Sequence, residues 1–186
     1  MERLGIPGVD ELSEEQKAVY DKVVNGPRGR IGGCLQFWLH RPELADRAQE
    51  LGIYLRYNTS LPARLSELAI LVIVRHWGAE FEWIHAPIAI KAGLSAEPVA
   101  ALKEGRKPIF ENDDETLVYE ITRDILLNKH LSDELYRRGM EALGQDMMVD
   151  LVGITGYYTM LCITMNTFHV LPEPREPNWS KEVGIE

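Results

Sequence analysis

Hydrophobic residues recur with a helical period along most of the chain. Between residues 42 and 58, apolar residues follow one another at spacings of three or four, which places them on one face of a helix: Leu44, Ala48, Leu51 and Leu55. The segment from 115 to 130 repeats this spacing. Such patterns predict amphipathic helices whose apolar faces pack into a common core.

Two segments are apolar almost without interruption. Residues 68–74 would also suit a buried strand, but the length of their segment and the proline at its start, Pro62, favour a helix that ends near Gly78. Residues 151–168 carry no charge and are about as long as a membrane-spanning helix. Their threonines, tyrosines and glycines, with no cluster of Lys or Arg afterwards, favour a buried core helix instead.

Capping residues and prolines divide the chain into helices. Ser13 and Gln16 form a capping-box pattern, and residues 79–93 read as one helix that Pro87 must kink or break. Together the signals predict an all-α single domain over residues 1–186, with about eight helices and no strand pair. Residues from about 171 onward hold several prolines and are expected to form an extended arm. The expected helix starts are Ser13, Pro42, Pro62, Ser95, Asn112 and Ser132.

The charge of the chain argues against nucleic acid as a partner. With 29 acidic and 20 basic residues the formal net charge is −9, and no basic stripe overrides it. Cys34 and Cys162 form neither a disulfide framework nor a Cys-x-x-Cys pair, so we interpret each as a small buried residue. This cysteine usage, and a start without a signal-peptide pattern, predict a cytoplasmic protein that does not enter a membrane.

Candidate chemistry is concentrated around His85. On a helix, Glu82 and His85 would share a face, and a carboxylate beside an imidazole suits acid–base chemistry near neutral pH. Glu67 is a second candidate because its neighbours are apolar. The structural alternatives are a solvated Glu82–His85 contact, and an ion pair from Glu67 to Arg64 or Arg75.

Cofactor and metal chemistry finds little support in the sequence. A di-iron helical bundle needs Glu-x-x-His on two helices, whereas only residues 82–85 have this spacing. There is no zinc-binding HExxH pattern, no nucleotide-binding glycine motif and no GxSxG nucleophile motif. By elimination, an enzyme here is expected to act without a tightly bound cofactor or metal.

The string LPARLSELAILVIVRHWGAEFEWIHAPIAIKAGLS, residues 61–95, resembles the core motif of the carboxymuconolactone decarboxylase-like family, which includes the alkylhydroperoxidase D (AhpD)-type proteins. Residues 151–170 resemble the family's closing helix, and the likeness covers roughly residues 35–170. It implies an AhpD-like all-α fold, extended here by an N-terminal helix, whose protomers interlock as a homotrimer or homohexamer. The peroxidase branch uses a Cys-x-x-Cys pair shortly before the histidine; residues 78–81 contain no cysteine, which argues against thiol peroxidase activity.

The decarboxylase branch needs no thiol. The resemblance implies a lyase of aromatic-compound catabolism that removes carbon dioxide from a small carboxylated lactone, with His85 transferring a proton and Glu82 or Glu67 orienting it. Arginine suits bidentate pairing with substrate carboxylates. The substrate-binding candidates are Arg30, Arg64, Arg75, Trp83 and His40.

Three hypotheses therefore stand. The first is a cofactor-free lyase of the decarboxylase kind, and the second is a different cofactor-free proton-transfer or C–C cleavage enzyme acting on a small aromatic-derived compound. The third is a non-catalytic helical oligomer. The first two predict a partly enclosed pocket that contains His85, and a loss of turnover when His85 is replaced while the fold is kept. The third predicts that His85 is packed in the core or lies on an open surface, and that its replacement costs stability alone.

Overall fold

The computed structural model describes residues 3–170, and this part of the chain is helical without any β-strand. The predicted all-α class is therefore confirmed. Two of the helices, η1 and η2, are short 3₁₀ segments. The elements are η1 (Val9–Glu11), α1 (Glu14–Val24), α2 (Cys34–Trp38), α3 (Pro42–Tyr57), α4 (Ala63–Trp77), η2 (Glu80–Ile84), α5 (His85–Lys91), α6 (Ala96–Glu104), α7 (Asp113–Asn128), α8 (Asp133–Ala142) and α9 (Gly144–Phe168).

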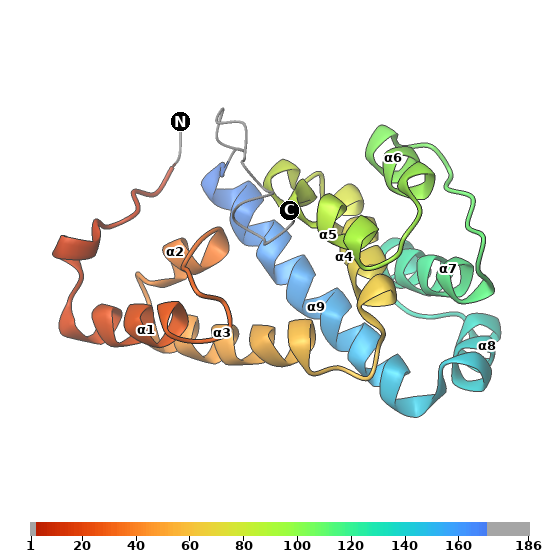
Figure 1. Cartoon of the computed structure of the whole chain (residues 1–186), viewed down its shortest axis with the longest axis horizontal. Helices are drawn as coiled ribbons and strands as arrows, with labels where there is room; N and C mark the ends of the chain where they lie inside the picture. Colours follow the sequence, from red (N-terminus) through yellow and green to blue (C-terminus); the bar gives the residue numbers. More distant parts are fainter. Residues whose placement is uncertain (1–2, 171–186) are drawn as a thin grey trace.

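Helix α4 forms the centre of the core. Residues 68–74 are helical, so the strand alternative is wrong, and every residue from 65 to 74 is buried because neighbouring helices surround α4. Its main partners are α9 and α7, with α5 and α6 also in contact. Figure 1 shows α1, α2 and α3 on one side of α9, with α6, α7 and α8 on the other.

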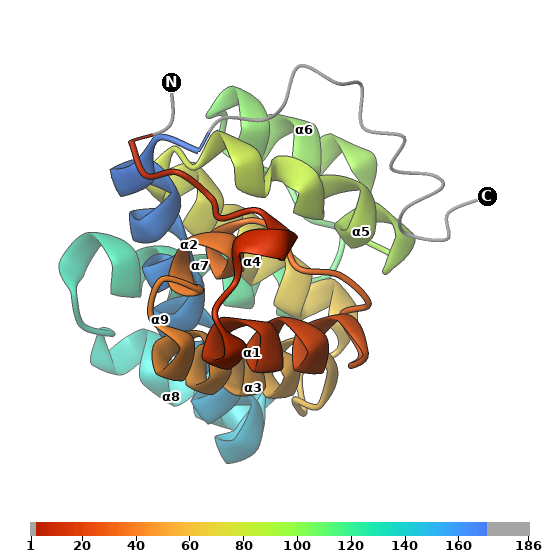
Figure 2. The same ribbon diagram turned by 90° about the vertical axis from the view of Figure 1, so that its left-hand side faces the viewer.

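Local capping explains where these helices begin and end. Ser13 Oγ accepts a hydrogen bond from the backbone N–H of Gln16, and the Gln16 side chain accepts one from Ser13, as the capping-box pattern predicts. Pro42 opens α3 at its first position, and Gly78 ends α4 in the left-handed conformation. Figure 2 shows α1 lying along α3, with α2 above them.

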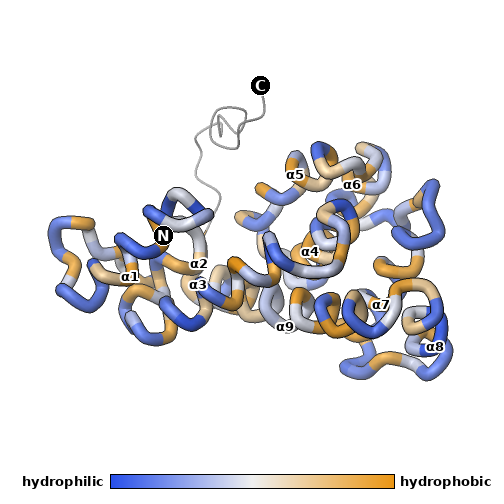
Figure 3. The backbone as a smooth tube through the Cα atoms, turned by 60° about the horizontal axis from the view of Figure 1, so that its bottom comes forward, coloured by the Kyte–Doolittle hydropathy of each residue, from blue (hydrophilic) through white to orange (hydrophobic). Residues whose placement is uncertain are grey.

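Helix α9 is long and apolar enough, by length and composition, to cross a membrane. It nevertheless packs along α4, and Leu151, Ile154 and Met165 are completely or almost completely buried against the core. This packing is that of a core helix, as we expected for residues 151–168. The outer loops are mostly hydrophilic (Figure 3). The expected C-terminal arm lies outside the described residues.

Candidate functional site

The site begins with a carboxylate in the most buried helix. Glu67 lies in the middle of α4 and is 5% exposed. Its Oε2 atom is 2.6 Å from Nδ1 of His85, so the imidazole N–H donates a hydrogen bond to the carboxylate. Glu67 therefore pairs with His85, and the alternative of an ion pair to Arg64 or Arg75 is wrong.

A change of helix type places His85 opposite Glu67. The chain leaves α4 at Gly78, forms the 3₁₀ turn η2, and enters α5 at His85. The single helix expected over residues 79–93 is thus two elements. Pro87 lies in the first turn of α5, where its missing N–H interrupts no helical hydrogen bond, so no kink is needed.

A second carboxylate faces the other ring nitrogen of His85. Glu82 lies in η2, and its Oε2 atom is 3.6 Å from His85 Nε2. Glu82 is 3% exposed and His85 2% exposed, so all three groups of the cluster are buried. With Nδ1–H donated to Glu67, Nε2 is the ring nitrogen that faces Glu82. We call Glu67, Glu82 and His85 the His85 cluster.

Electrostatics distinguish the two carboxylates. Burial raises the pKa of Glu82, and the charges of His85, Arg56 and Arg28 oppose this effect without cancelling it. The Tyr158 ring meets the imidazole edge to face, with centroids 5.3 Å apart, and burial raises the pKa of its hydroxyl well above the ordinary value. Glu82 is therefore a carboxyl group that is easily protonated next to a histidine of fixed tautomer.

Two arginines near this cluster were missed by sequence reasoning. Arg56, half-buried at the end of α3, interacts electrostatically with both Glu67 and Glu82. Arg28, from the glycine-rich loop after α1, acts on Glu82 and donates a 3.5 Å hydrogen bond from Nη2 to the Tyr157 hydroxyl. The buried Nε of Arg28 has no hydrogen-bond partner among residues 3–170. No sequence signal separates Arg28 from the other arginine in its loop, and only tertiary packing selects Arg56.

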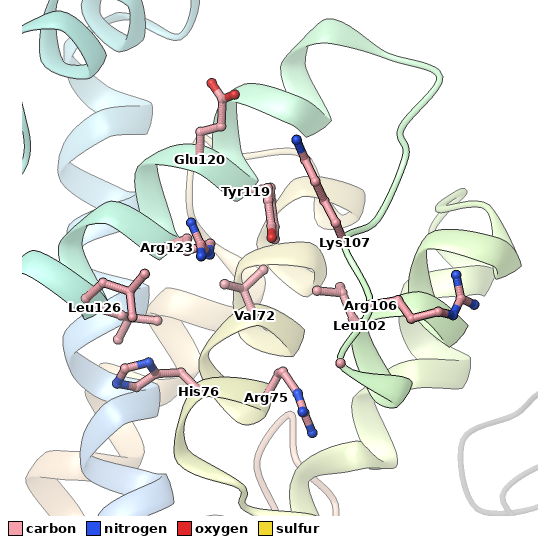
Figure 4. Close-up of a pocket in the computed structure, with 12 residues that line it drawn as sticks. Val72, Arg75, His76, Leu102, Arg106, Lys107, Tyr119, Glu120, Arg123 and Leu126 are labelled. Atoms are coloured by element: carbon pink, nitrogen blue, oxygen red, sulfur yellow. The ribbon is translucent and has the colours of Figure 1, made fainter.

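The expected substrate-binding residues are dispersed. Arg64 is paired with Asp114 and Glu115 of α7, and Arg75 lines a surface pocket between α4, α6 and α7 (Figure 4). Neither guanidinium therefore lies at the His85 cluster. The remaining candidates are Arg30, exposed before α2; His40, exposed with Nε2 2.8 Å from the Gly5 carbonyl oxygen; and Trp83, buried with Lys103 Nζ 5.9 Å from its ring centroid.

The two cysteines are free and buried. Burial raises the pKa of the Cys34 thiol well above its ordinary value and that of Cys162 to about 12, and the charge of Glu82 raises both further. A thiolate is the reactive form of cysteine, so neither thiol is prepared for nucleophilic attack. Residues 3–170 contain no group of three or more His, Cys, Asp or Glu side chains arranged to hold a metal ion.

Comparisons with known proteins give similarity at the level of structure only. No family model matches the sequence, and no curated protein matches it. An uncharacterized peroxidase-related protein from Silicibacter sp. TM1040 superposes with a TM-score of 0.73 at 12% identity, covering 93% of this chain and 92% of the other. The alkylhydroperoxidase AhpD core of an uncharacterized peroxidase-related protein from Ralstonia eutropha JMP134 gives 0.74 at 12% identity, covering 93% of each chain. The chain therefore has the AhpD-like fold.

Proposed function

We propose that the protein is a cofactor-free acid–base enzyme in which His85 transfers a proton to or from a small carboxylated substrate. One observation carries the proposal: each ring nitrogen of a buried histidine faces a buried carboxylate, Glu67 at 2.6 Å and Glu82 at 3.6 Å. A carboxylate on Nδ1 fixes the tautomer and stabilises the imidazolium that forms when Nε2 takes a proton. Such an arrangement suits general acid–base catalysis.

Decarboxylation of a small carboxylated lactone is the reaction we propose first. The bond between the ring carbon and the carboxylate breaks, carbon dioxide leaves, and the electron pair is delocalised into the lactone. The protonated Nε2 of His85 then delivers one proton to carbon, and solvent restores that proton, so the net reaction consumes one proton. Arg28 and Arg56 are the cations near the cluster that would attract the substrate's carboxylates.

Substrate access requires movement around the imidazole. His85 is 2% exposed, and the Tyr158 ring lies against it, so the imidazole is packed in the core rather than in the partly enclosed pocket that the enzyme hypotheses predict. Binding must therefore displace side chains that cover Nε2, and the exclusion of water afterwards would strengthen the electrostatic interactions of the cluster.

The test is turnover of enzymatically generated 4-carboxymuconolactone, followed by release of carbon dioxide. We expect His85→Gln to lower kcat by about 10²–10⁴-fold, the usual contribution of a general acid or base. His130→Gln, which changes an exposed histidine after α7, is the matched control and should retain full activity. Circular dichroism establishes that both variants are folded.

The outcomes separate the three hypotheses. A folded, inactive His85→Gln variant of an active enzyme supports the decarboxylase. An inert wild type would reject this reaction, and solvent-deuterium incorporation into small carboxylated aromatic-derived compounds then tests for another proton-transfer reaction. If His85→Gln changes stability but no compound exchanges, the chain is a non-catalytic helical protein.

Thiol peroxidase activity is the competing function, because the two similar structures described above are called peroxidase-related. The buried Cys34 and Cys162, with their raised pKa values, oppose it. We expect no peroxide reduction in a thiol-coupled assay. Activity that disappears in Cys34→Ser or Cys162→Ser would overturn this expectation.

We also propose that the protein assembles as a homotrimer or homohexamer. Apolar side chains remain exposed on the long helices α3 and α9, where association with a second copy would remove them from water. Sedimentation should give a mass of three or six protomers, and a monomer at micromolar concentration would overturn the proposal. These side chains are Leu44, Leu51 and Tyr54 on α3, and Val149, Val152 and Ile163 on α9.

A further inference from the structure

A surface pocket lies on the opposite side of α4 from the His85 cluster. It has a volume of about 500 Å³ and is enclosed by the second half of α4, the end of α6 with the residues after it, and α7. Val72 and His76 line it, and at 100° per residue they lie about 140° and 180° around α4 from Glu67. The cavity therefore does not belong to the site described above. We call it the α4–α7 pocket.

The lining of this pocket combines an apolar floor with a basic rim. Leu102 and Leu126 join Val72 at its base, and Tyr119 adds an aromatic ring (Figure 4). Basic side chains from three segments surround this floor: Arg75 from α4, Lys107 from the residues after α6, and Arg123 from α7. Apolar walls with a few charged groups are typical of sites for small organic molecules.

The positive charges of the rim are not balanced by nearby carboxylates. Within the described part of the chain, Arg75, Lys107 and Arg123 have no ion pair and no side-chain hydrogen bond. Glu120 is the acidic residue of the lining, and its Oε2 is 3.0 Å from Nη1 of Arg138, outside the pocket. In a chain of net charge −9, three uncompensated cations around one cavity form a local site of positive potential.

Arg75 lies close to the turn that ends α6. Gly105 ends α6 with φ +76°, and a Cβ atom built there would lie 2.3 Å from Nη2 of Arg75. The guanidinium therefore lies directly against the backbone of Gly105, in space that only glycine leaves open.

We propose that the α4–α7 pocket binds a small organic anion that carries an aromatic or other apolar portion. The anionic group is held by Arg75, Lys107 and Arg123, and the apolar portion lies on Val72, Leu102 and Leu126. Binding relieves the mutual repulsion of the three cations and removes apolar surface from water. The proposal is independent of the reaction at His85.

The test uses 2-naphthoate as the probe, with 2-naphthamide and acetate as matched ligands that lack the charge or the apolar portion. Binding to the full chain is measured by isothermal titration calorimetry. We expect saturable binding of 2-naphthoate that is at least about tenfold tighter than that of either matched ligand. The double variant Lys107→Gln/Arg123→Gln should weaken it by about tenfold or more; both side chains are exposed, so the fold is kept.

Two control variants locate the binding. Lys17→Gln removes an exposed cation on α1, outside the pocket, and should leave the Kd unchanged. His85→Gln should also leave it unchanged if the probe avoids the His85 cluster. Equal binding of 2-naphthamide, an unaltered Kd in the double variant, or loss of binding in His85→Gln would each overturn the proposal, as would the absence of saturable binding.

Discussion

Asp150 and Glu82 are both buried carboxyl groups, but their surroundings are opposite. Asp150 of α9 accepts hydrogen bonds from the Ser60 backbone N–H at 2.7 Å, the Ser60 hydroxyl at 2.6 Å and the Tyr54 hydroxyl at 2.9 Å. Glu82, in the described part of the chain, accepts no hydrogen bond, and its neighbour is His85 Nε2 at 3.6 Å. Hydrogen bonds therefore stabilise the charge of Asp150, whereas none from residues 3–170 stabilises a charge on Glu82. We call the groups around Asp150 the satisfied cluster.

The pKa values follow this difference. Burial opposes the ionisation of Asp150, but the hydrogen bonds from Ser60 and Tyr54 outweigh it and lower the pKa of Asp150. Burial dominates at Glu82 and raises its pKa. A carboxylate that is fully hydrogen-bonded holds helices together, whereas a buried carboxyl group without such bonds beside an imidazole costs stability and is suited to proton transfer.

The largest effect that would sharpen this comparison is expected at Glu67. We expect Glu67→Gln to lower turnover by about 10²–10⁴-fold, because an amide can donate to Nδ1 and so favour the wrong tautomer of His85. Glu67 acts through His85 and is a positioning residue. Nitrogen NMR of labelled histidine reads the tautomer directly and should change in this variant.

Glu115→Gln is the control for Glu67→Gln. Glu115 is also a buried carboxylate, but it pairs with Arg64 of α4. The control should lower stability without changing the His85 tautomer. If both variants left the tautomer and the relative turnover unchanged, Glu67 would have only a structural role.

The second prediction concerns the satisfied cluster. We expect Asp150→Asn to lower the free energy of unfolding at pH 7 by about 2–3 kcal/mol, since hydrogen bonds to a charged acceptor are lost and an amide cannot accept all three. Because the folded pKa is lowered, the stabilisation is present above the ordinary value of 3.8 and is lost as pH falls through the folded value. Urea unfolding at several pH values should show this loss, and a cost that does not depend on pH would contradict it.

The sequence predicts the helix boundaries better than it predicts the geometry of the site. Helix boundaries at Ser13, Pro42 and Gly78 are determined by local hydrogen bonds and backbone conformation, and the structure confirms them. The apolar run 68–74 was ambiguous because burial on all sides removes periodicity from either structure. Its helical form depends on the neighbours of α4.

The site was only partly predictable from the sequence, because part of its geometry also depends on tertiary packing. Glu82 and His85 are three residues apart, so any helical turn brings them near each other, although the turn is 3₁₀ rather than α. The hydrogen bond from His85 to Glu67 joins residues 18 positions apart in the sequence. It depends on how the chain turns at Gly78, where α4 ends. Arg28 reaches Glu82 only through tertiary packing, which local patterns do not encode.

The third prediction tests whether Glu82 costs stability. Its pKa is raised, so ionisation destabilises the folded state, and this cost is absent below the ordinary value of 4.5 and grows as pH rises through the folded value. We therefore expect Glu82→Gln to gain stability relative to the wild type as pH rises from about pH 4 to pH 8. Glu80→Gln, an exposed neighbour in η2, is the control and should show no such gain. A Glu82→Gln variant that is less stable at pH 8 would show that the His85 cluster is structural.

The smallest effect is expected from one hydroxyl of the satisfied cluster. Tyr54→Phe removes the 2.9 Å hydrogen bond to Asp150 Oδ1 but keeps the ring, and both hydrogen bonds from Ser60 remain. We expect the free energy of unfolding to fall by less than in Asp150→Asn, because one of three hydrogen bonds is lost and the exposed Tyr54 hydroxyl exchanges it for bonds to water. Tyr136→Phe, on α8, is the control, since the Tyr136 hydroxyl forms no side-chain hydrogen bond among residues 3–170. A loss as large as that of Asp150→Asn would mean that Tyr54, rather than Ser60, satisfies the charge of Asp150.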